Sequence, residues 1–199
     1  MEATTQVKRG ARAPDRDTSS LRPRSLDDLS RLDVGELGQV YARGTTPARL
    51  GVLEGHPRGR MLSVRALDRG LPARLLRQLA GSSAFPWGGK SFAGNGETGT
   101  GLNRVHLAGR HQLFPFLTSV GPSVLDGAPC VVLDYDLPDN PRLIRAIHDE
   151  VREIEPGLFL GPAMWKAASG PKLVLWFALD TRVQAPAVGL PTVAATLAK

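Results

Sequence analysis

Apolar residues in the first third of the chain recur at the three- and four-residue spacing of an amphipathic helix. Ser25 belongs to the residue types that cap helix N-termini, and such a series follows it; a second series runs from Asp33 to Arg43. Gly44 ends the second series, where glycine suits the left-handed conformation that follows a last helical turn. The predicted elements are a helix from Ser25 that buries Leu26, Leu29 and Leu32, a helix over 33–43, a strand over 60–66 and a helix over 71–79.

From residue 85 onward, short apolar segments alternate with clusters of Gly, Pro, Asn and Asp, a pattern typical of an antiparallel sheet. The predicted strands cover residues 89–93, 102–107, 113–119, 130–135, 158–165 and 172–179. Together with the strand over 60–66, they predict a sheet of seven strands.

Residues 140–154 are predicted to form a helix that interrupts these strands. Asn140 suits the capping position and Pro141 suits the first helical position. The apolar residues then fall on one helical face, while the charged residues are expected to form a solvated, salt-bridged face. The apolar residues are Leu143, Ile144, Ile147, Val151 and Ile154, and the charged residues are Arg145, Asp149, Glu150 and Arg152.

The segment 172–180 indicates how the sheet is arranged, because both of its faces are apolar. Such a strand is central, or it lines a hydrophobic interior on one side while a helix covers the other. Leu173, Leu175, Phe177 and Leu179 form one face, and Val174, Trp176 and Ala178 form the other. Because few strands alternate with helices, a doubly wound parallel sheet is not favoured. We predict an α+β fold: an antiparallel β-barrel or strongly curved half-barrel, with an N-terminal helical segment and one helix packed on the sheet.

The 199 residues carry a formal net charge of +6, most of it near the two ends of the chain. Residues 1–24 contain six Lys or Arg against three Asp or Glu, and 181–199 contain two Lys or Arg and no acidic residue. Both ends lack an apolar period, so we expect a disordered basic tail over 1–24, a single domain over 25–180 and a flexible tail over 181–199. No RNA- or DNA-binding motif accompanies the charge, so a nucleic-acid partner is not favoured.

Composition also bears on location. No apolar run approaches the ~18 residues of a membrane span, so we expect no such span. The single cysteine, Cys130, cannot form an internal disulfide, and we expect it to be a small core residue. Residues 1–21 lack the apolar core of a signal peptide, so a cytoplasmic location is expected.

Motifs that would indicate a cofactor or metal are incomplete. The glycine-rich segment 94–99 matches a dinucleotide-binding pattern, yet it lies between two predicted strands instead of before a helix. His106 and His111 have no obvious third ligand nearby in the sequence. We therefore expect neither a cofactor nor a metal.

Two polar clusters are candidate catalytic sites. Alternation puts Asp134 and Asp136 on one face of a strand, where enclosure would raise the pKa of one carboxyl toward a range useful for proton transfer. Lys166 follows an apolar strand and, if desolvated, could act as a base or nucleophile. The structural alternative is that the aspartates serve turn and cap chemistry and that Lys166 extends to solvent at a strand end.

The strand Trp87-Gly88-Gly89-Lys90-Ser91-Phe92, followed by Gly101-Leu102-Asn103, resembles a bacterial and plant group of lipocalin-like small barrels. Their opening strand reads Trp-x-Gly-Lys-x-Phe, and a Gly-x-Asn strand follows it. The resemblance covers about residues 85–180, but Phe85-Pro86 stands where these barrels carry a glycine ahead of the tryptophan. It implies a barrel with an apolar interior that binds a hydrophobic small molecule, and some relatives in the broader superfamily act as cyclases or isomerases.

The favoured function is therefore the binding of a lipid, isoprenoid or polyketide-like molecule inside the barrel. The candidate ligand-binding residues are Trp87, Lys90, Asn103, Phe116, Phe159 and Trp176. The plain alternative is that the aromatic residues among them are only core. A rival hypothesis is an isomerase, cyclase or lyase that uses Asp134 or Asp136 as general base and Lys166 or Lys90 to polarise a carbonyl. A third is an interaction protein that works through its basic tails.

Overall fold

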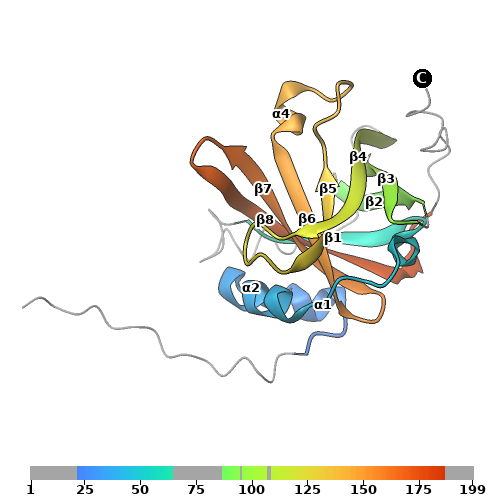
Figure 1. The fold of residues 1–199 in the computed structure, drawn as a ribbon. Helices are drawn as coiled ribbons and strands as arrows, with labels where there is room; N and C mark the ends of the chain where they lie inside the picture. The colour runs from blue at the N-terminus through green and yellow to red at the C-terminus, as the bar shows by residue number, and fades with distance from the viewer. Residues whose placement is uncertain (1–21, 65–86, 95, 107–108, 187–199) are drawn as a thin grey trace, which may run out of the picture.

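Eight antiparallel strands pair in chain order, and the last pairs with the first to close a barrel (Figure 1). The computed structural model describes residues 22–64, 87–94, 96–106 and 109–186. The strands are β1 (Pro57–Val64), β2 (Trp87–Ala93), β3 (Thr98–His106), β4 (Arg110–Pro122), β5 (Pro129–Asp134), β6 (Ile147–Glu155), β7 (Leu158–Ala167) and β8 (Gly170–Gln184). The helices are α1 (Leu26–Leu29), α2 (Val34–Arg43), the 3-10 helix η2 (Leu50–Leu53) and α4 (Arg142–Arg145).

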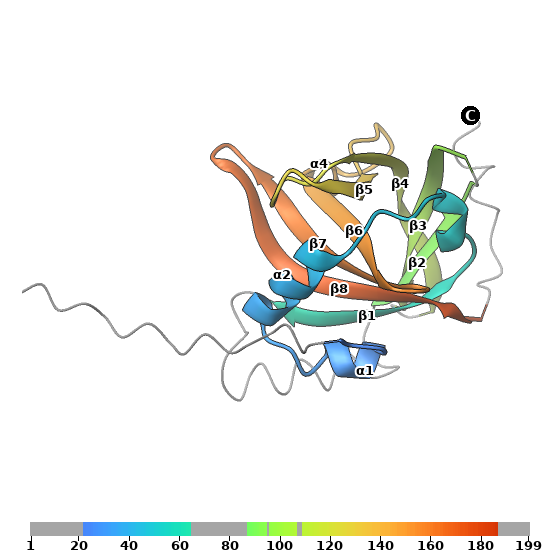
Figure 2. The ribbon, with the colours of Figure 1, turned by 60° about the horizontal axis from the view of Figure 1, so that its bottom comes forward.

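The helices α1 and α2 lie against the outside of the barrel (Figure 2), where α1 contacts β8 and α2 contacts β6. The predicted cap at Ser25 is confirmed, because its side chain accepts a hydrogen bond from the Asp28 amide. At the start of α2, Asp33 and Glu36 form a reciprocal capping box. The three predicted leucines of the first helix are buried with α2 against outward-facing side chains of the strands. Trp176 and Ala178 belong to this outer cluster, so a helix covers the outer face of β8, which is the second of the two arrangements that its sequence left open.

Gly44 ends α2 in an extended conformation with a φ of −67°, so the expected left-handed conformation is wrong. Glycine is required there by close packing instead. A Cβ at this position would lie 2.9 Å from the Cβ of Arg152 and 3.2 Å from the carbonyl oxygen of Glu153. The end of α2 therefore presses directly onto β6.

The predicted helix over 140–154 is wrong. Only Arg142–Arg145 form a helical turn, and the segment from Ile147 to Glu155 is the strand β6, so the barrel has eight strands instead of seven. The residues expected on a solvated helix face, Asp149, Glu150 and Arg152, are buried, and only Arg145 of that group stays partly exposed. Their partners lie far away in the sequence, so a short stretch of sequence does not show that these charges are buried. The segment therefore has the charge pattern of an amphipathic helix although it forms a strand.

All seven predicted strands are otherwise confirmed, with ends that differ by a few residues. The glycine-rich segment 94–99 connects β2 to β3 and does not precede a helix. The predicted helix over 71–79, residues 65–66 and 107 of two predicted strands, and residues 1–21 and 187–199 of the predicted tails lie outside the described residues. The start of the predicted C-terminal tail is different from the expectation, because β8 continues to Gln184 and pairs there with Pro57 of β1.

The barrel interior is divided into two halves. At the end where η2 lies, apolar side chains pack the interior closely, and Leu50 and Leu53 of η2 belong to that cluster. The other members are Phe92, Phe116, Val131, Leu133, Tyr135, Val151, Phe159, Phe177 and Leu179, of which Tyr135 and Phe177 also border the looser half. At the opposite end α4 connects β5 to β6, and there the packing is looser, as described below.

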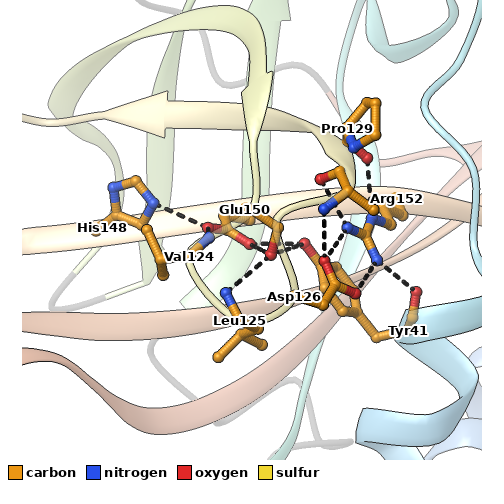
Figure 3. A network of polar contacts seen from close by, with 10 residues as sticks. Tyr41, Val124, Leu125, Asp126, Pro129, His148, Glu150 and Arg152 are labelled. Atoms are coloured by element: carbon orange, nitrogen blue, oxygen red, sulfur yellow. Dashed lines mark hydrogen bonds and ion pairs between the residues drawn. The ribbon is translucent and has the colours of Figure 1, made fainter.

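The outward side chains of β6 attach α2 and the β4–β5 turn to the barrel (Figure 3). Glu150 is fully buried, and its carboxylate accepts hydrogen bonds from the Tyr41 hydroxyl at 2.7 Å and the Ser123 hydroxyl at 2.5 Å. It also accepts from the Val124 amide at 2.7 Å, and His148 Nε2 lies 3.1 Å away. Burial alone would raise the pKa of Glu150, but these hydrogen bonds outweigh it and hold the pKa below its usual value.

Arg152 makes the second attachment. Its guanidinium forms a two-pronged ion pair with Asp126, with N to O distances of 2.6 and 2.7 Å, and donates to the carbonyls of Pro129 and Ala128. It also lies 4.4 Å from the ring centre of Tyr41 on α2. Strand β6 is thus held by polar contacts outside the barrel, which fixes the direction of its inward side chains.

We expect Glu150→Gln to lower the free energy of unfolding by about 1–3 kcal/mol at pH 7, because an amide NH₂ would face donors that need an acceptor. A carboxyl whose pKa is lowered by folding stabilises the protein above its unfolded pKa of about 4.3 and loses that contribution as the pH falls. Urea unfolding between pH 7 and pH 3.5 should therefore show a steeper loss of stability below about pH 4.5 in the wild type than in Glu150→Gln. The exposed Glu54→Gln serves as control, and equal slopes for all three proteins would contradict the prediction.

Candidate functional site

A partly open cavity of about 230 Å³ occupies the half of the interior nearer α4. Side chains from β1, β2, β3, β4, β6, β7, β8 and α4 contribute to its wall. The apolar members are Met61, Trp87, Val105, Phe114, Ile144, Ile147, Ala163, Leu175 and Phe177, and the polar members are Lys90, Asn103, Tyr135 and Asp149. The cavity is therefore a mostly apolar space with one group of polar side chains in its wall.

Lys90 is the centre of this polar group. Its ammonium nitrogen lies 2.8 Å from Asp149 Oδ2, 2.5 Å from the Tyr135 hydroxyl and 2.9 Å from Asn103 Oδ1. Lys90 and Asp149 are 2% and 3% exposed, so the ion pair is buried. The strand register explains why these side chains lie together. Lys90 on β2 pairs directly with Asn103 on β3. Asp149 on β6 pairs with Leu133, which lies two residues before Tyr135.

Further hydrogen bonds connect the other members. Tyr135 donates to Asp149 Oδ2 at 3.1 Å, and the Asn103 side-chain amide donates to the Tyr135 oxygen at 3.1 Å. The indole N–H of Trp87 donates to Asn103 Oδ1 at 3.1 Å. One atom is left over: Asp149 Oδ1 is buried and has no hydrogen-bond partner among the described residues.

Burial and the charge of Asp149 act in opposite directions on Lys90. Burial lowers the pKa of Lys90, and Asp149 at 2.8 Å only partly opposes that effect. Burial, aided by the charge of Asp149, raises the pKa of Tyr135 well above its usual value, so the phenol stays protonated at neutral pH. Four aromatic rings surround the ammonium group at 4.9 to 5.6 Å from its nitrogen, those of Phe177, Tyr135, Phe116 and Trp87.

Phe114 lies in the cavity wall in a left-handed conformation, with a φ of +59°. A bulky residue pays about 1–3 kcal/mol for such a conformation. Phe114 lies in a β-bulge of β4, where the pairing of β3 with β4 changes register between Gly101 and Asn103. The Phe114 carbonyl accepts a hydrogen bond of 3.4 Å from Asn103, so the bulge ties the cavity wall to the polar group.

The structure brings together three of the six predicted ligand-binding residues, Trp87, Lys90 and Asn103, at the cavity. Phe116 and Phe159 are fully buried inside the barrel, in its closely packed half. Trp176 lies outside the barrel, where its ring centre is 5.5 Å from that of Tyr41 on α2. It does not line the cavity, because it alternates with the inward Leu175 and Phe177 along β8.

The predicted catalytic residues lie on the outer surface. Lys166 is not desolvated: its side chain is 37% exposed, and Nζ lies 3.2 Å from Asp134 Oδ1, whose side chain is 49% exposed. Asp136 is exposed too and pairs with Arg145 at 2.6 Å. The alternation that puts Asp134 and Asp136 on one face is right, but that face points away from the interior, which Leu133 and Tyr135 line.

Tyr135 and Asp149 are not among the site residues predicted from the sequence. The sequence pattern placed Asp149 on the surface of a helix. In the structure it lies on strand β6, where the alternate residues Ile147, Asp149 and Val151 face the barrel interior. A carboxylate between two apolar residues at strand spacing, together with the inward Lys90, is the signal that could have identified the pair.

Comparisons with known proteins name no family and no activity. No protein-family description matches the chain, and no curated protein matches it. Among solved structures, the chain is similar to a crystal structure of a protein from Thermomonospora curvata, with 21% sequence identity and a TM-score of 0.44. The match covers 75% of this chain and 87% of that one, and at this level it carries no argument about function.

Two further features of the described residues are relevant. No helix among them is long and apolar enough to cross a membrane. No group of three or more His, Cys, Asp or Glu side chains within them is arranged to hold a metal ion.

We expect Lys90→Met to lower the free energy of unfolding by about 3–5 kcal/mol, because Asp149 would be left as a buried charge without its cation. The double variant Lys90→Met, Asp149→Leu removes both charges and should be more stable than the single variant. Chemical denaturation of the wild type, both single variants and the double variant measures this coupling.

Lys166→Met is the matched control, since it removes a lysine from an exposed ion pair and should cost no more than about 1 kcal/mol. Additive losses in the Lys90 and Asp149 variants would show that the two side chains are not energetically paired.

Proposed function

We propose that this protein binds a hydrophobic small molecule in the cavity at the α4 end of its barrel. The observation that carries the proposal is the partly open apolar cavity of about 230 Å³, with a hydrogen-bonded polar group in its wall. Ligand sites in proteins are typically concave and mostly apolar, with a few polar groups that fix orientation. A lipid, isoprenoid or polyketide-like molecule would place part of its apolar body here.

The division of the interior supports this proposal. Close packing in the η2 half supplies a core, so the α4 half need not be filled to keep the barrel folded. For comparison, an engineered cavity of about 150 Å³ lined by apolar side chains binds benzene. The present cavity is half as large again and accommodates an apolar group of about ten non-hydrogen atoms. A longer ligand would extend through the open side.

A cytoplasmic location is part of the proposal. It is supported by the cysteine content, because proteins of oxidising compartments often carry disulfides. The chain has one cysteine, Cys130, which is buried and forms no disulfide. Burial raises its pKa to about 12, so the thiol is unreactive at neutral pH.

Native mass spectrometry of the protein purified from its own cells, followed by organic extraction, tests the binding proposal. Ala163 is a small residue of the cavity wall, so Ala163→Phe should fill the space, whereas Val183→Leu adds a methylene on the exposed outside. We expect a discrete additional mass on the wild type and Val183→Leu that is lost on denaturation, and none on Ala163→Phe.

Calorimetric titration with 2-methylnaphthalene, a purely apolar probe of suitable size, gives the same comparison without a co-purified ligand. Thermal unfolding verifies that Ala163→Phe folds. Equal binding by Ala163→Phe and the wild type, or no binding by the wild type in either experiment, would overturn the proposal.

The hydrogen-bonded chain of Lys90, Tyr135 and Asp149 favours a second candidate function, an isomerase, cyclase or lyase acting on such a molecule. The Tyr135 hydroxyl, protonated at neutral pH, donates to Asp149 here and would have to turn to a substrate carbonyl to give it a proton or hydrogen bond, which would leave Asp149 free to accept a proton. Lys90, one of the residues predicted to polarise a carbonyl, holds both groups in place. These three side chains border the cavity, unlike Asp134, Asp136 and Lys166.

If this second function holds, incubation of the extracted ligand with the wild type should change its mass or retention in liquid chromatography. Tyr135→Phe should abolish the change, because the ring keeps its packing while the acid is lost. Recovery of the ligand unaltered from the wild type, or unchanged conversion by Tyr135→Phe, would exclude this mechanism. Native mass spectrometry of Tyr135→Phe shows whether the variant still binds.

A further inference from the structure

We propose that the ligand enters the cavity with an uncharged hydrocarbon end, and that its polar or charged head stays in water at the mouth. This inference rests on the proposed function and names the class of ligand. It favours a lipid or isoprenoid with one long apolar end over a polyketide-like molecule, which carries oxygen atoms along its length.

The hydrogen-bond donors of the polar group are already in use. The three N–H bonds of Lys90 are matched by acceptor atoms at 2.5 to 2.9 Å, on Asn103, Tyr135 and Asp149. The Tyr135 hydroxyl donates its hydrogen to Asp149. The Asn103 amide donates to the Phe114 carbonyl and to the Tyr135 oxygen, which thus accepts two hydrogen bonds. A ligand group that accepts hydrogen bonds therefore finds no free donor among these described side chains.

The acceptors of the group offer no partner either. Asn103 Oδ1 accepts from Lys90 and from the indole N–H of Trp87. Asp149 Oδ2 accepts from Lys90 and Tyr135. Asp149 Oδ1 has no partner among the described residues, but it is buried, so a molecule in the cavity cannot reach it. A polar group of the ligand that left water for this cavity would therefore lose its hydrogen bonds without replacement.

The charges of the polar group are balanced as well. Lys90 and Asp149 form a buried ion pair. A ligand carboxylate at this depth would add an uncompensated negative charge, and a ligand ammonium group would add a positive one. Neither sign of charge is favoured inside, so we expect a charged head of either sign to stay in water.

The partly exposed side chains of the cavity wall are apolar. The four polar side chains and Phe177 are buried, whereas every other lining residue is only half-buried, Met61, Trp87, Ile144 and Leu175 among them. The polar group therefore lies at the inner end of the cavity, and the apolar side chains extend from it to the mouth. A hydrocarbon chain gains free energy from each methylene that leaves water for this wall.

The first test compares three ten-carbon probes, decanoate, decylammonium and decanedioate, in calorimetric titrations of the full chain at neutral pH. Physiological salt screens the net positive charge of the chain. We expect Kd values for decanoate and decylammonium within about threefold of each other, because both heads stay in water. Decanedioate has a carboxylate at each end, so it must bury one of them and should bind at least about tenfold more weakly than decanoate.

The opposite orientation gives a different result. A carboxylate held inside by Lys90 would make decanoate bind far more tightly than decylammonium, and would leave decanedioate about as tight as decanoate. Either observation would overturn the inference.

Nuclear magnetic resonance measures the orientation directly, with decanoate that carries carbon-13 at its carboxyl and terminal methyl carbons. A water-soluble gadolinium chelate broadens the signals of atoms near solvent. We expect it to broaden the carboxyl signal of bound decanoate and to spare the methyl signal. Ala163→Phe, which fills the cavity, should abolish this protection, whereas Val183→Leu on the exposed outside should keep it. A protected carboxyl with an exposed methyl would contradict the proposal.

The outcomes separate this inference from the proposed function. If the wild type binds 2-methylnaphthalene but none of the ten-carbon probes, or binds decanoate with its carboxylate inside, the cavity is a ligand site and this inference alone is wrong. If neither 2-methylnaphthalene nor any ten-carbon probe binds, both proposals fail.

Discussion

The buried ion pair between Lys90 and Asp149 determines what the interior of this barrel can contain. Removing two charges from water costs several kcal/mol for each, and the mutual attraction and the hydrogen bonds must offset that cost. Asn103 and Tyr135 supply those hydrogen bonds, so four strand segments must keep a fixed register. The contacts of Glu150 and Arg152 outside the barrel also help to keep this register, because they hold β6, the strand that carries Asp149, in place. The cavity borders the polar group that results.

Local patterns predicted most of the fold. The capped helices at Ser25 and Asp33 and seven of the eight strands follow from residue type and spacing within a short window, where sequence carries the physical information. Strand β6 could not be recognised in this way. Its charged residues are buried by partners such as Tyr41, which is 109 residues away from Glu150. In a short stretch of sequence such charges are expected to face solvent, and only the folded barrel, with α2 and the β4–β5 turn packed on β6, shows that they are buried.

The same limit applies to the candidate site. Trp87, Lys90 and Asn103 come from adjacent strands, and the motifs that contain them pointed to the cavity directly. Asp149 joins them from β6, the strand that was not recognised, so half of the ion pair was missing from the sequence-based site. Asp134 and Lys166 attracted attention because polar residues beside apolar strands look functional. Which side of a strand faces inward depends on the whole sheet, and here it left both of them outside.

Closure of the barrel by pairing of β1 with β8 has a consequence for how the chain folds. Arg58 pairs with Asp180, so closure must wait until nearly the whole described chain is available, and such non-local pairing is slow. Before closure, we expect Lys90 and Asp149 to stay in contact with water, because their burial depends on the assembled barrel wall. We therefore expect dehydration of the pair to be a late step of folding, so the polar group in the barrel wall would limit when the barrel can close as well as what its cavity can hold.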